Sequence, residues 1–372
     1  MSNNASADFR WLRTGEDALA SMLAAIESAE KSVRLEMYIY TASPVGEQFR
    51  DTLVRAQQRG VRVRVLIDAL GSLKLSASFW EPLIAAGGEC SWFNPLRLER
   101  LLYRDHRKIL VCDEHLAFVG GYNIAPEYQG DGVTKGWRDL GLKVSGPLAQ
   151  HLAACFDAQF ASADFQHRRL SYLRKSALRI GLATLDGELF LSGPGRGLSP
   201  MHRALLSDLT QAKEIRIISA YFLPTRRFRR ALMRRAREGA PVQLILAGRS
   251  DVLLSKLAGQ HLYRSLLRSG VEIYEYQPQI LHAKLFILDD IVYVGSANLD
   301  TRSLHINYEL LIRLVKTQLT DEARAIFAQD LKHSQRIHPA AWQASRTFWH
   351  KLKERWAHFI LARVDPYLAR RQ

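Results

Sequence analysis

The sequence predicts an α/β protein made of two similar halves, each with a mixed β-sheet covered by helices. Two observations predict this fold class: helical segments alternate with short β-branched runs, and one set of segments occurs twice in the same order. In the first half, residues 16–29 and 46–59 have a helical period, whereas 33–40 and 61–67 have the pattern of strands. This alternation is typical of an α-β-α sandwich.

The duplication is visible in four pairs of segments. KSVRL at 31–35 resembles KEIRI at 213–217, RGVRVRVLI at 59–67 resembles EGAPVQLIL at 238–246, GGE at 87–89 resembles GVE at 270–272, and HRKILVCD at 106–113 resembles HAKLFILD at 282–289. Four matches in one order predict two halves with the same topology. We therefore expect a first half at 1–165, a connecting segment at 166–199, a second half at 200–335 and a C-terminal tail at 336–372.

Composition narrows the functional classes. The chain has 372 residues, of which 47% are hydrophobic and 24% charged, so it has ample material for two cores and is too apolar for disorder. Its formal net charge of +15 points to an anionic partner such as a membrane surface, nucleic acid or a phosphate-bearing substrate. Three scattered cysteines (Cys90, Cys112 and Cys155) argue against a disulfide framework or a zinc cluster and favour a reducing compartment.

Targeting signals are missing from the sequence. The first residues do not have the basic and apolar pattern of a signal peptide, and no run of about 20 apolar residues predicts a transmembrane helix. We therefore expect a protein without a membrane span.

The strongest candidate site is a motif that occurs in both halves, His-x-Lys-x-x-x-x-Asp followed by a glycine-rich turn and an asparagine. Its members are His106, Lys108, Asp113 and Asn123 in the first half and His282, Lys284, Asp289, Ser296 and Asn298 in the second. Histidine and lysine two residues apart share one face of a strand. Lysine supplies a charge and asparagine a neutral donor, which suits phosphate oxygens. We count Asp113 and Asp289 with the motif, although their expected position in turns indicates a structural role.

Three carboxylates accompany the motif. Asp139 and Glu309 each begin an apolar strand, after the histidine of the same half. From this parallel position we expect each to accept a hydrogen bond from its own histidine and so fix the tautomer of the imidazole. Glu36 lies within a predicted strand and is either an exposed charge or a buried carboxylate close to the site.

The doubled motif resembles the phospholipase D superfamily. The surrounding segments LEMYIY, FNP, RDHRK, GGYNIAPEY, WRDLGLKVSGP, AYFLP and GSANLDTRSLHINYE are similar to those of bacterial cardiolipin synthases, over about residues 11–315. The missing N-terminal transmembrane hairpin resembles the shorter, B-type branch of that family.

The resemblance implies a phospholipase D-like fold in which the two halves face each other across one active site. One histidine attacks phosphorus and forms a phosphohistidine, while the other protonates the leaving alcohol and then activates the incoming hydroxyl. The usual pattern of the superfamily makes His106 the nucleophile and His282 the acid and base, although the symmetry of the motifs also permits the reverse. The lysines and asparagines would hold the phosphate oxygens, with no metal and no cofactor.

The resemblance also implies the reaction and leaves alternatives. The expected enzyme is a phosphatidyl transferase that joins two phosphatidylglycerols into cardiolipin and releases glycerol. A phospholipase D hydrolase, a phosphodiesterase acting on nucleic acid and a membrane-binding scaffold remain as alternatives. The expected partners are phosphatidylglycerol and other phospholipids, with no nucleic acid, and the sequence leaves the oligomeric state open.

Two basic segments are candidates for a membrane-binding surface. Residues 225–237 contain seven arginines around an apolar stripe, which fits a surface held against anionic lipid or an ordinary amphipathic helix with a solvated basic face. In the tail, Trp349, Leu352, Trp356 and Phe359 recur on one helical face flanked by Lys and Arg. This pattern favours an interfacial helix, and a helix docked on the protein itself or a dimer contact is the alternative. We therefore expect peripheral attachment to the cytoplasmic face of the bacterial inner membrane.

Overall fold

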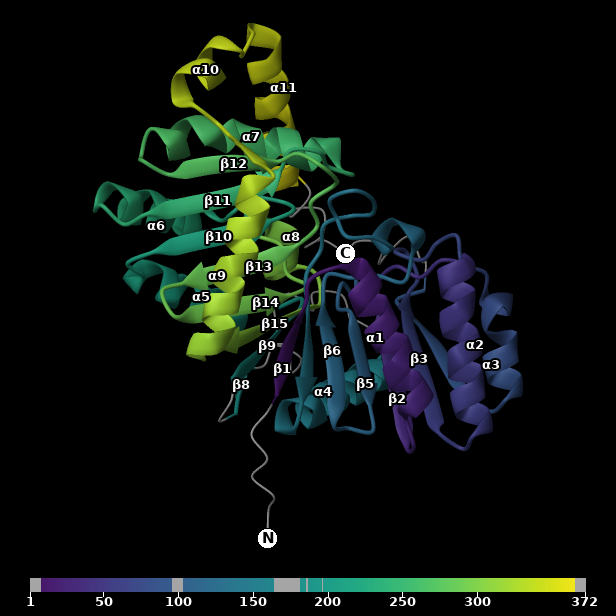
Figure 1. The fold of residues 1–372 in the computed structure, drawn as a ribbon. Coiled ribbons are helices and arrows are strands. Elements are labelled where there is room, and N and C mark those ends of the chain that lie inside the picture. Colours follow the sequence, from purple (N-terminus) through teal and green to yellow (C-terminus); the bar gives the residue numbers. More distant parts are fainter. Residues whose placement is uncertain (1–7, 96–102, 164–180, 185–186, 196, 365–372) are drawn as a thin grey trace.

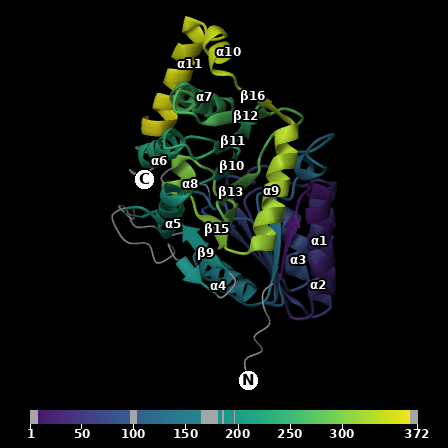
Figure 2. The ribbon, with the colours of Figure 1, turned by 60° about the vertical axis from the view of Figure 1, so that its left-hand side comes forward.

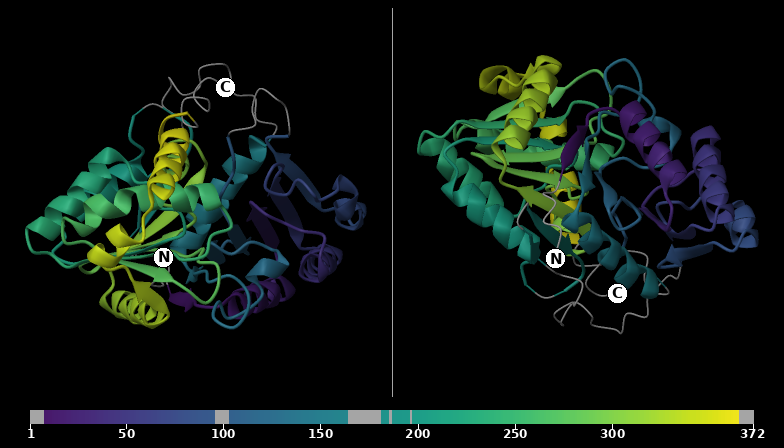
Figure 3. Two further views of the ribbon diagram at one scale, coloured as in Figure 1. Left: turned by 90° about the horizontal axis from the view of Figure 1, so that it is seen from above. Right: turned by 60° about the horizontal axis from the view of Figure 1, so that its bottom comes forward.

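The two halves lie side by side, each around its own mixed β-sheet (Figures 1 and 3). The computed structural model describes residues 8–95, 103–163, 181–184, 187–195 and 197–364. The predicted α/β fold class with two mixed sheets is confirmed.

The first half contains a sheet with the strand order β1-β7-β6-β5-β2-β3-β4 within the described residues. Its strands are β1 (Phe9–Leu12), β2 (Ser32–Met37), β3 (Arg62–Asp68), β4 (Glu89–Phe93), β5 (Ile109–Cys112), β6 (Leu116–Gly120) and β7 (Gly141–Ser145). Its helices are α1 (Gly15–Ser28), α2 (Pro44–Gln58), α3 (Glu81–Ala85) and α4 (Pro147–Ala161). The predicted helices and strands of this half therefore form, with ends shifted by only a few residues.

The second half repeats this order with additional strands at both edges. Its described sheet has the order β16-β12-β11-β10-β13-β14-β15-β9-β8. The strands are β8 (Gly181–Ala183), β9 (Glu188–Ser192), β10 (Ile215–Ser219), β11 (Val242–Ala247), β12 (Glu272–Tyr276), β13 (Lys284–Leu288), β14 (Ile291–Gly295), β15 (Glu309–Leu314) and β16 (Ser334–Arg336). The helices are α5 (Pro200–Gln211), α6 (Arg226–Arg237), α7 (Leu253–Leu267), α8 (Thr301–His305) and α9 (Thr317–Lys332), and the tail adds α10 (Pro339–Ala344) and α11 (Phe348–Phe359).

Burial explains how the two halves are held together. The outer face of the first sheet packs against α1 and α2, and the outer face of the second packs against α5, α6 and α7. The inner faces share one core with α4 and α9, to which Val119 and Leu142 contribute from the first sheet and Val294 and Ile312 from the second. A core shared in this way fixes the relative position of the two sheets.

Two regions differ in detail from the predicted organisation. The segment 166–199, expected to be a connection, contributes β8 and β9 to the second sheet, and residues 164–180 lie outside the described part. The last eight residues of the tail also lie outside it. Among the described residues, every helix falls short of the length and apolar character that crossing a lipid bilayer requires.

The two motif aspartates occupy equivalent turns. Asp113 and Asp289 have φ angles of 55° and 54°, and each lies in the turn between two antiparallel strands, β5–β6 and β13–β14. The Asp113 carboxylate accepts hydrogen bonds from the backbone N–H groups of Glu30, Lys31 and Ser32 at 2.7–2.9 Å. The Asp289 carboxylate binds the N–H groups of Lys213 and Glu214 at 2.8 Å in the same way. These hydrogen bonds tie each turn to the start of the neighbouring strand.

We predict that Asp289→Asn destabilises the protein and leaves the active site intact. Asparagine tolerates a positive φ but lacks the negative charge that strengthens the hydrogen bonds from Lys213 and Glu214, so the variant should lose about 1–3 kcal/mol of folding free energy. Thermal unfolding followed by circular dichroism measures this loss. Asp290→Asn is the matched control, because within the described part of the chain the Asp290 side chain forms only a surface ion pair with Arg324, which is worth about 0–1 kcal/mol. A variant of normal stability that has lost activity would instead assign Asp289 to the chemistry.

Candidate active site

The site lies where the segment before each motif strand meets the opposite half. The N–H of His106 donates to the carbonyl of Tyr308 at 3.0 Å, and the N–H of His282 donates to the carbonyl of Arg138 at 2.7 Å. These contacts belong to isolated parallel bridges, Asp105 with Tyr308 and Arg138 with Leu281. The backbone thus carries each histidine next to a segment that bears a carboxylate of the other half.

The histidine–carboxylate pairs are crossed between the halves. His106 Nδ1 lies 3.0 Å from Glu309 Oε2, and His282 Nδ1 lies 2.6 Å from Asp139 Oδ2. The expectation that each carboxylate serves the histidine of its own half is therefore wrong. The reason is that the two halves pair through their histidine segments, which places each imidazole closer to the opposite carboxylate. With Nδ1–H donated to a carboxylate, Nε2 of each ring is left to react.

Glycine is required at three positions next to the histidine–carboxylate pairs. Gly120 and Gly295 have φ angles of 151° and 158°, and a Cβ atom would lie 2.5 Å from Gly141 Cα and 2.2 Å from Leu310 O, respectively. A Cβ atom on Gly121 would lie 2.0 Å from Asp139 Oδ1. A side chain at position 121 would therefore displace the carboxylate that binds His282.

Ser296 occupies the position in the second half that Gly121 occupies in the first. Its hydroxyl donates to Glu309 Oε2 at 2.5 Å, and the hydroxyl of Ser303 donates to Oε1 at 2.8 Å. Among the described residues, the Ser296 side chain thus contacts the Glu309–His106 pair through Glu309. Asp139 instead accepts the backbone N–H of Leu140 at 2.7 Å. The two carboxylates consequently have different hydrogen-bond donors.

Burial and charge also distinguish the two pairs. Burial raises the pKa of Glu309 to about 7, although Lys108 and the two serine hydroxyls favour its ionised form. Burial also acts on Asp139, but the charges of His282 and Lys284 outweigh it and hold its pKa below the ordinary value. Glu309 therefore titrates near neutral pH, whereas Asp139 stays ionised.

Both histidines are largely removed from water. His106 is 8% exposed and His282 is 4% exposed. Burial, followed by the charges of Lys108 and Lys284, lowers the pKa of His106 well below its ordinary value. Burial and Lys284 lower the pKa of His282 as well, while ionised Asp139 opposes this change. A neutral imidazole is thus the resting form of His106, and His282 has the stronger partner for a proton.

The two lysines are buried beside the histidines. Lys108 Nζ donates to the carbonyl of His106 at 2.7 Å, and Lys284 Nζ donates to the carbonyl of His282. Burial lowers the pKa of Lys108 to about 7 and lowers that of Lys284. Both carboxylates of the site, Asp139 and Glu309, oppose this effect. An anion between the lysines would restore their full charge, because it would offset the cost of burial.

The asparagines differ between the halves. Asn123 Oδ1 accepts the N–H of Ile39 at 2.9 Å and its Nδ2 donates to the hydroxyl of Tyr128 at 2.7 Å, so this amide fixes the end of β2. Asn298 is buried, and its Oδ1 has no hydrogen-bond partner among the described residues. The structure thus leaves the Asn298 amide more available to a ligand than that of Asn123.

Aromatic side chains surround both imidazoles, and the sequence did not single them out as site residues. The ring of Tyr38 lies 4.7 Å from that of His106, and Tyr128 and Trp137 each lie 5.6 Å from His282. Tyr221 lies 6.4 Å from His282. Tyr38 and Tyr221 follow β2 and β10, so the duplication was a signal that could have predicted their place.

A charged network lies behind His106. Arg107 Nε lies 2.7 Å from Glu36 Oε1 and 3.3 Å from Asp105 Oδ1, and all three side chains are buried. Glu36 is therefore the buried carboxylate of the two alternatives, and burial raises its pKa well above the ordinary value. Apolar residues replace the network in the second half: Ile218, Leu281 and Ala283 occupy the equivalent positions.

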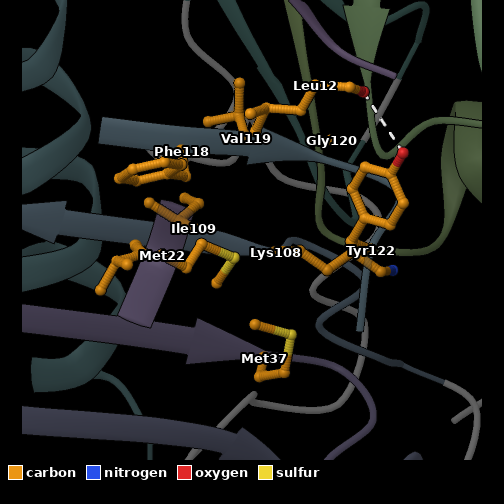
Figure 4. A pocket seen from close by; sticks show the side chains of 10 residues that line it. Leu12, Met22, Met37, Lys108, Ile109, Phe118, Val119, Gly120 and Tyr122 are labelled. Carbon is orange, nitrogen blue, oxygen red and sulfur yellow. Dashed lines mark hydrogen bonds between the residues drawn. The ribbon is translucent and has the colours of Figure 1, made fainter. Parts of the chain in front are cut away.

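A small cavity lies in the core next to Lys108 (Figure 4). Its volume is about 10 Å³, close to that of one water molecule. The lining is mostly apolar and includes Met22, Met37, Phe118 and Tyr122, whose hydroxyl donates to the carbonyl of Leu12 at 3.2 Å. It is too small for a phospholipid group and is therefore not the place where the substrate binds.

The fold and the paired site define a class, that of phospholipase D-like proteins with both half-sites in one chain. The family model described as "Cardiolipin synthase, PLD-like domain" matches residues 22–159 and 205–331, one segment in each half. Among solved structures, phosphatidylserine synthase of Haemophilus influenzae shares the fold with a TM-score of 0.71 and 17% identity, over 98% of this chain and 95% of the other. Polyphosphate kinase of Porphyromonas gingivalis aligns with a TM-score of 0.60 and 14% identity, over 94% of this chain and 53% of the other.

Curated relatives are more specific. The chain is 32% identical to "Cardiolipin synthase 1" of Bacillus anthracis over 96% of its length and 72% of the relative. It is 33% identical to "Cardiolipin synthase" of Alkalihalophilus pseudofirmus over 94% of its length and 71% of the relative. The chain therefore belongs to the cardiolipin synthase family, as the sequence motifs indicated, and it is an enzyme of phosphatidyl transfer.

We predict that Ser296→Ala moves the acid limb of the pH–activity profile upward. Glu309 gains its charge as pH rises through about 7, and the ionised form is the one that orients His106. Without the Ser296 hydroxyl the carboxylate loses a stabilising donor, so its pKa rises and less of it is ionised at neutral pH. We expect the acid limb of the transferase pH–activity profile to move upward by about one pH unit.

The control for this experiment is Ser192→Ala. Ser192 is also buried, but among the residues that the structure describes its hydroxyl donates only to the backbone carbonyls of Ser303 and Asn307. Its profile should match that of the unmodified protein. If the profile of Ser296→Ala also matched, Glu309 would not be the group that sets the acid limb.

Proposed function

We propose that this protein joins two phosphatidylglycerol molecules into cardiolipin and releases glycerol, through a covalent phosphohistidine. The observation that carries the proposal is the presence of two buried imidazoles in one site, each held by a carboxylate of the opposite half. A two-step transfer needs one nucleophile and one acid and base, which a pair of this kind supplies. The family to which the chain belongs supports the same reaction.

In the first step, His106 is the nucleophile. The lone pair on its Nε2 attacks the phosphorus of the first phosphatidylglycerol. The P–N bond forms as the bond from phosphorus to the oxygen of the headgroup glycerol breaks. Protonated His282 gives its proton to that oxygen, so glycerol leaves as a neutral alcohol. The pKa of both histidines is lowered, but at His282 the ionised carboxylate of Asp139 opposes the change, which supports this assignment over the reverse.

The second step repeats these events in reverse with another alcohol. Neutral His282 takes the proton from a headgroup hydroxyl of the second phosphatidylglycerol, whose oxygen attacks phosphorus. The P–N bond breaks and its electron pair returns to His106. Cardiolipin is released and both histidines regain their starting protonation.

Lys108 and Lys284 would hold the non-bridging oxygens of the reacting phosphate throughout. Their charges offset the negative charge that develops in the pentacoordinate transition state, in a site from which water is largely excluded. The Nδ2 group of Asn298 would donate to the same phosphate oxygens, whereas Asn123 would act by fixing the end of β2. Asp113 and Asp289 would support the turns and not touch substrate.

Exposed apolar side chains beside the site support phospholipid substrates over nucleic acid. The loop after β3 exposes Leu73 (60%), and α7 begins with exposed Leu253 (67%) after β11. Ser72 in the first loop donates to the carbonyl of Tyr38, and Asp251 next to α7 accepts the hydroxyl of Tyr221 at 2.6 Å. Both loops therefore contact a tyrosine that lies against a site histidine, and their apolar tips suit acyl chains.

We also infer peripheral attachment to the anionic cytoplasmic face of the bacterial inner membrane. The net charge of +15 and the lipid substrates of the family support this location. The substrates are confined to a membrane, so the enzyme must reach its surface.

We predict that purified protein converts labelled phosphatidylglycerol in micelles into cardiolipin and free glycerol in the presence of EDTA. Mass spectrometry of the products gives the result. Phosphatidic acid as the only product would assign a hydrolase, in which water replaces the second lipid. Cleavage of an oligonucleotide without lipid turnover would contradict the proposal.

We further predict that His282→Ala accumulates a covalent phosphatidyl adduct and that His106→Ala does not. The substrate is a phosphatidyl ester of an acidic phenol, which leaves without protonation, so His106 can still attack when His282 is missing. The incoming alcohol then lacks its base, which slows the second step by about 10²–10⁴-fold. Intact-protein mass measures the adduct, and its appearance only in His106→Ala would exchange the two roles.

A further inference from the structure

A second basic site lies on the outer side of the second half, between α6 and α7. It is a groove of about 420 Å³ lined by Arg229, Met233, Arg237, His261, Leu262, Arg264, Ser265 and Arg268. The lining contains four arginines and no carboxylate, and it shares no residue with the histidine site. This groove is therefore a separate concave surface with strong positive charge.

None of the described carboxylates neutralises the four guanidinium groups of the groove. Within the described part of the chain, Arg229, Arg237, Arg264 and Arg268 make no side-chain hydrogen bond or ion pair. Arg235 on the same helix shows the contrast, because it forms an ion pair with Glu238 at 2.6 Å. Like charges held together in a groove repel each other, and an anion bound among them would remove that cost.

Cations in the groove and next to it act on two of the groove residues. Burial, with the charges of Arg226 and Arg230, lowers the pKa of Arg229. Burial and the charges of Arg355 and Arg229 lower the pKa of His261. Burial is the larger cause of both pKa changes, and the cations that add to it lie in or next to the groove, where they would favour a bound phosphate.

Helix α11 borders the groove and turns its aromatic face outward. Its inner face packs on α7 through Ala357, and the ring of His358 lies 4.7 Å from that of His261. On the opposite face Trp349 is 68% and Trp356 is 63% exposed, together with Phe348, Leu352 and Phe359. Figure 2 shows α6, α7 and α11 along the same outer side of the second half. The predicted apolar stripe of the tail thus faces away from the protein and not into its core.

We propose that the arginine groove binds the headgroup phosphate of an anionic phospholipid in a bilayer, while the aromatic face of α11 lies in the interface of the same membrane. Arginine binds phosphate through parallel hydrogen bonds, and tryptophan with flanking cations is typical of interfacial helices. The exposed apolar face of α11 favours a membrane over a nucleic acid. A nucleic acid would need cations at this face, which offers apolar area instead. The proposal rests on the membrane attachment proposed above, and not on the chemistry of the histidines.

The test compares two double variants with the same loss of charge. Arg264→Gln with Arg268→Gln removes two guanidinium groups of the groove. Arg227→Gln with Arg230→Gln removes two exposed arginines of α6 that do not line it. Sedimentation with phosphatidylcholine vesicles, with or without phosphatidylglycerol, measures binding.

We expect the groove variant to bind phosphatidylglycerol vesicles about tenfold or more weakly, and the control about threefold or less. Cardiolipin formation in detergent micelles should stay unchanged in both variants, because neither pair contacts the histidine site. This arm separates failure of the groove proposal from failure of the proposed reaction. Equal losses of vesicle binding in the two variants would mean that only the general surface charge matters and would overturn the proposal. Unchanged binding of the groove variant would overturn it as well.

A second arm tests the aromatic face. Trp349→Ala with Trp356→Ala should weaken vesicle binding, and brominated lipid should quench tryptophan emission of the unmodified protein more than that of this variant. Equal quenching of the two proteins would overturn the role of α11. An oligonucleotide or free glycerol phosphate is added at the same phosphate concentration. If either one displaced the protein from the vesicles, the groove would be a site for a soluble anion instead.

Discussion

The crossed hydrogen bonds between each site histidine and a carboxylate of the other half are the interaction on which the rest of the site depends. His106 is held by Glu309 and His282 by Asp139, so neither half has an oriented imidazole by itself. The shared core and the buried ion pair between Arg138 and Asp330 at 2.7 Å keep the two halves in this relation. Because the pairs are buried, a shift of one sheet against the other would leave a polar group without its partner. Packing between the halves and orientation of the site are therefore one constraint.

A nearly symmetric scaffold surrounds two histidines whose chemical settings differ. Ser296 donates to Glu309, whereas Gly121 at the equivalent position leaves room only for Asp139 itself. The charged network of Arg107 and Glu36 behind His106 has apolar residues in its place behind His282. A two-step transfer needs one imidazole that starts neutral and another that holds a proton, so differences of this kind suit the proposed reaction.

Much of the fold and part of the site could be predicted from the sequence, because those features are local. The period of 16–29 and the alternation of 61–67 predicted α1 and β3, since helices and strands bury one face at fixed spacings. The turn positions of Asp113 and Asp289 were predicted as well. The strands β8 and β9 were not predicted, because they are short and depend on a distant pairing: β9 pairs with β15, which lies far along the chain, and β8 pairs with β9.

The sequence by itself determined the duplication, the two sets of motif residues, the family and the aromatic stripe of the tail, because each is written in spacing along one segment. Only the tertiary structure decided which carboxylate binds which histidine. That choice depends on how two halves pair across a pseudo-twofold interface, and spacing within one half does not encode it. The same holds for the arginine groove, whose charges come from α6 and α7 together. The net charge of +15 was visible from the start, but its concentration in one groove beside an outward aromatic face is a property of the folded chain.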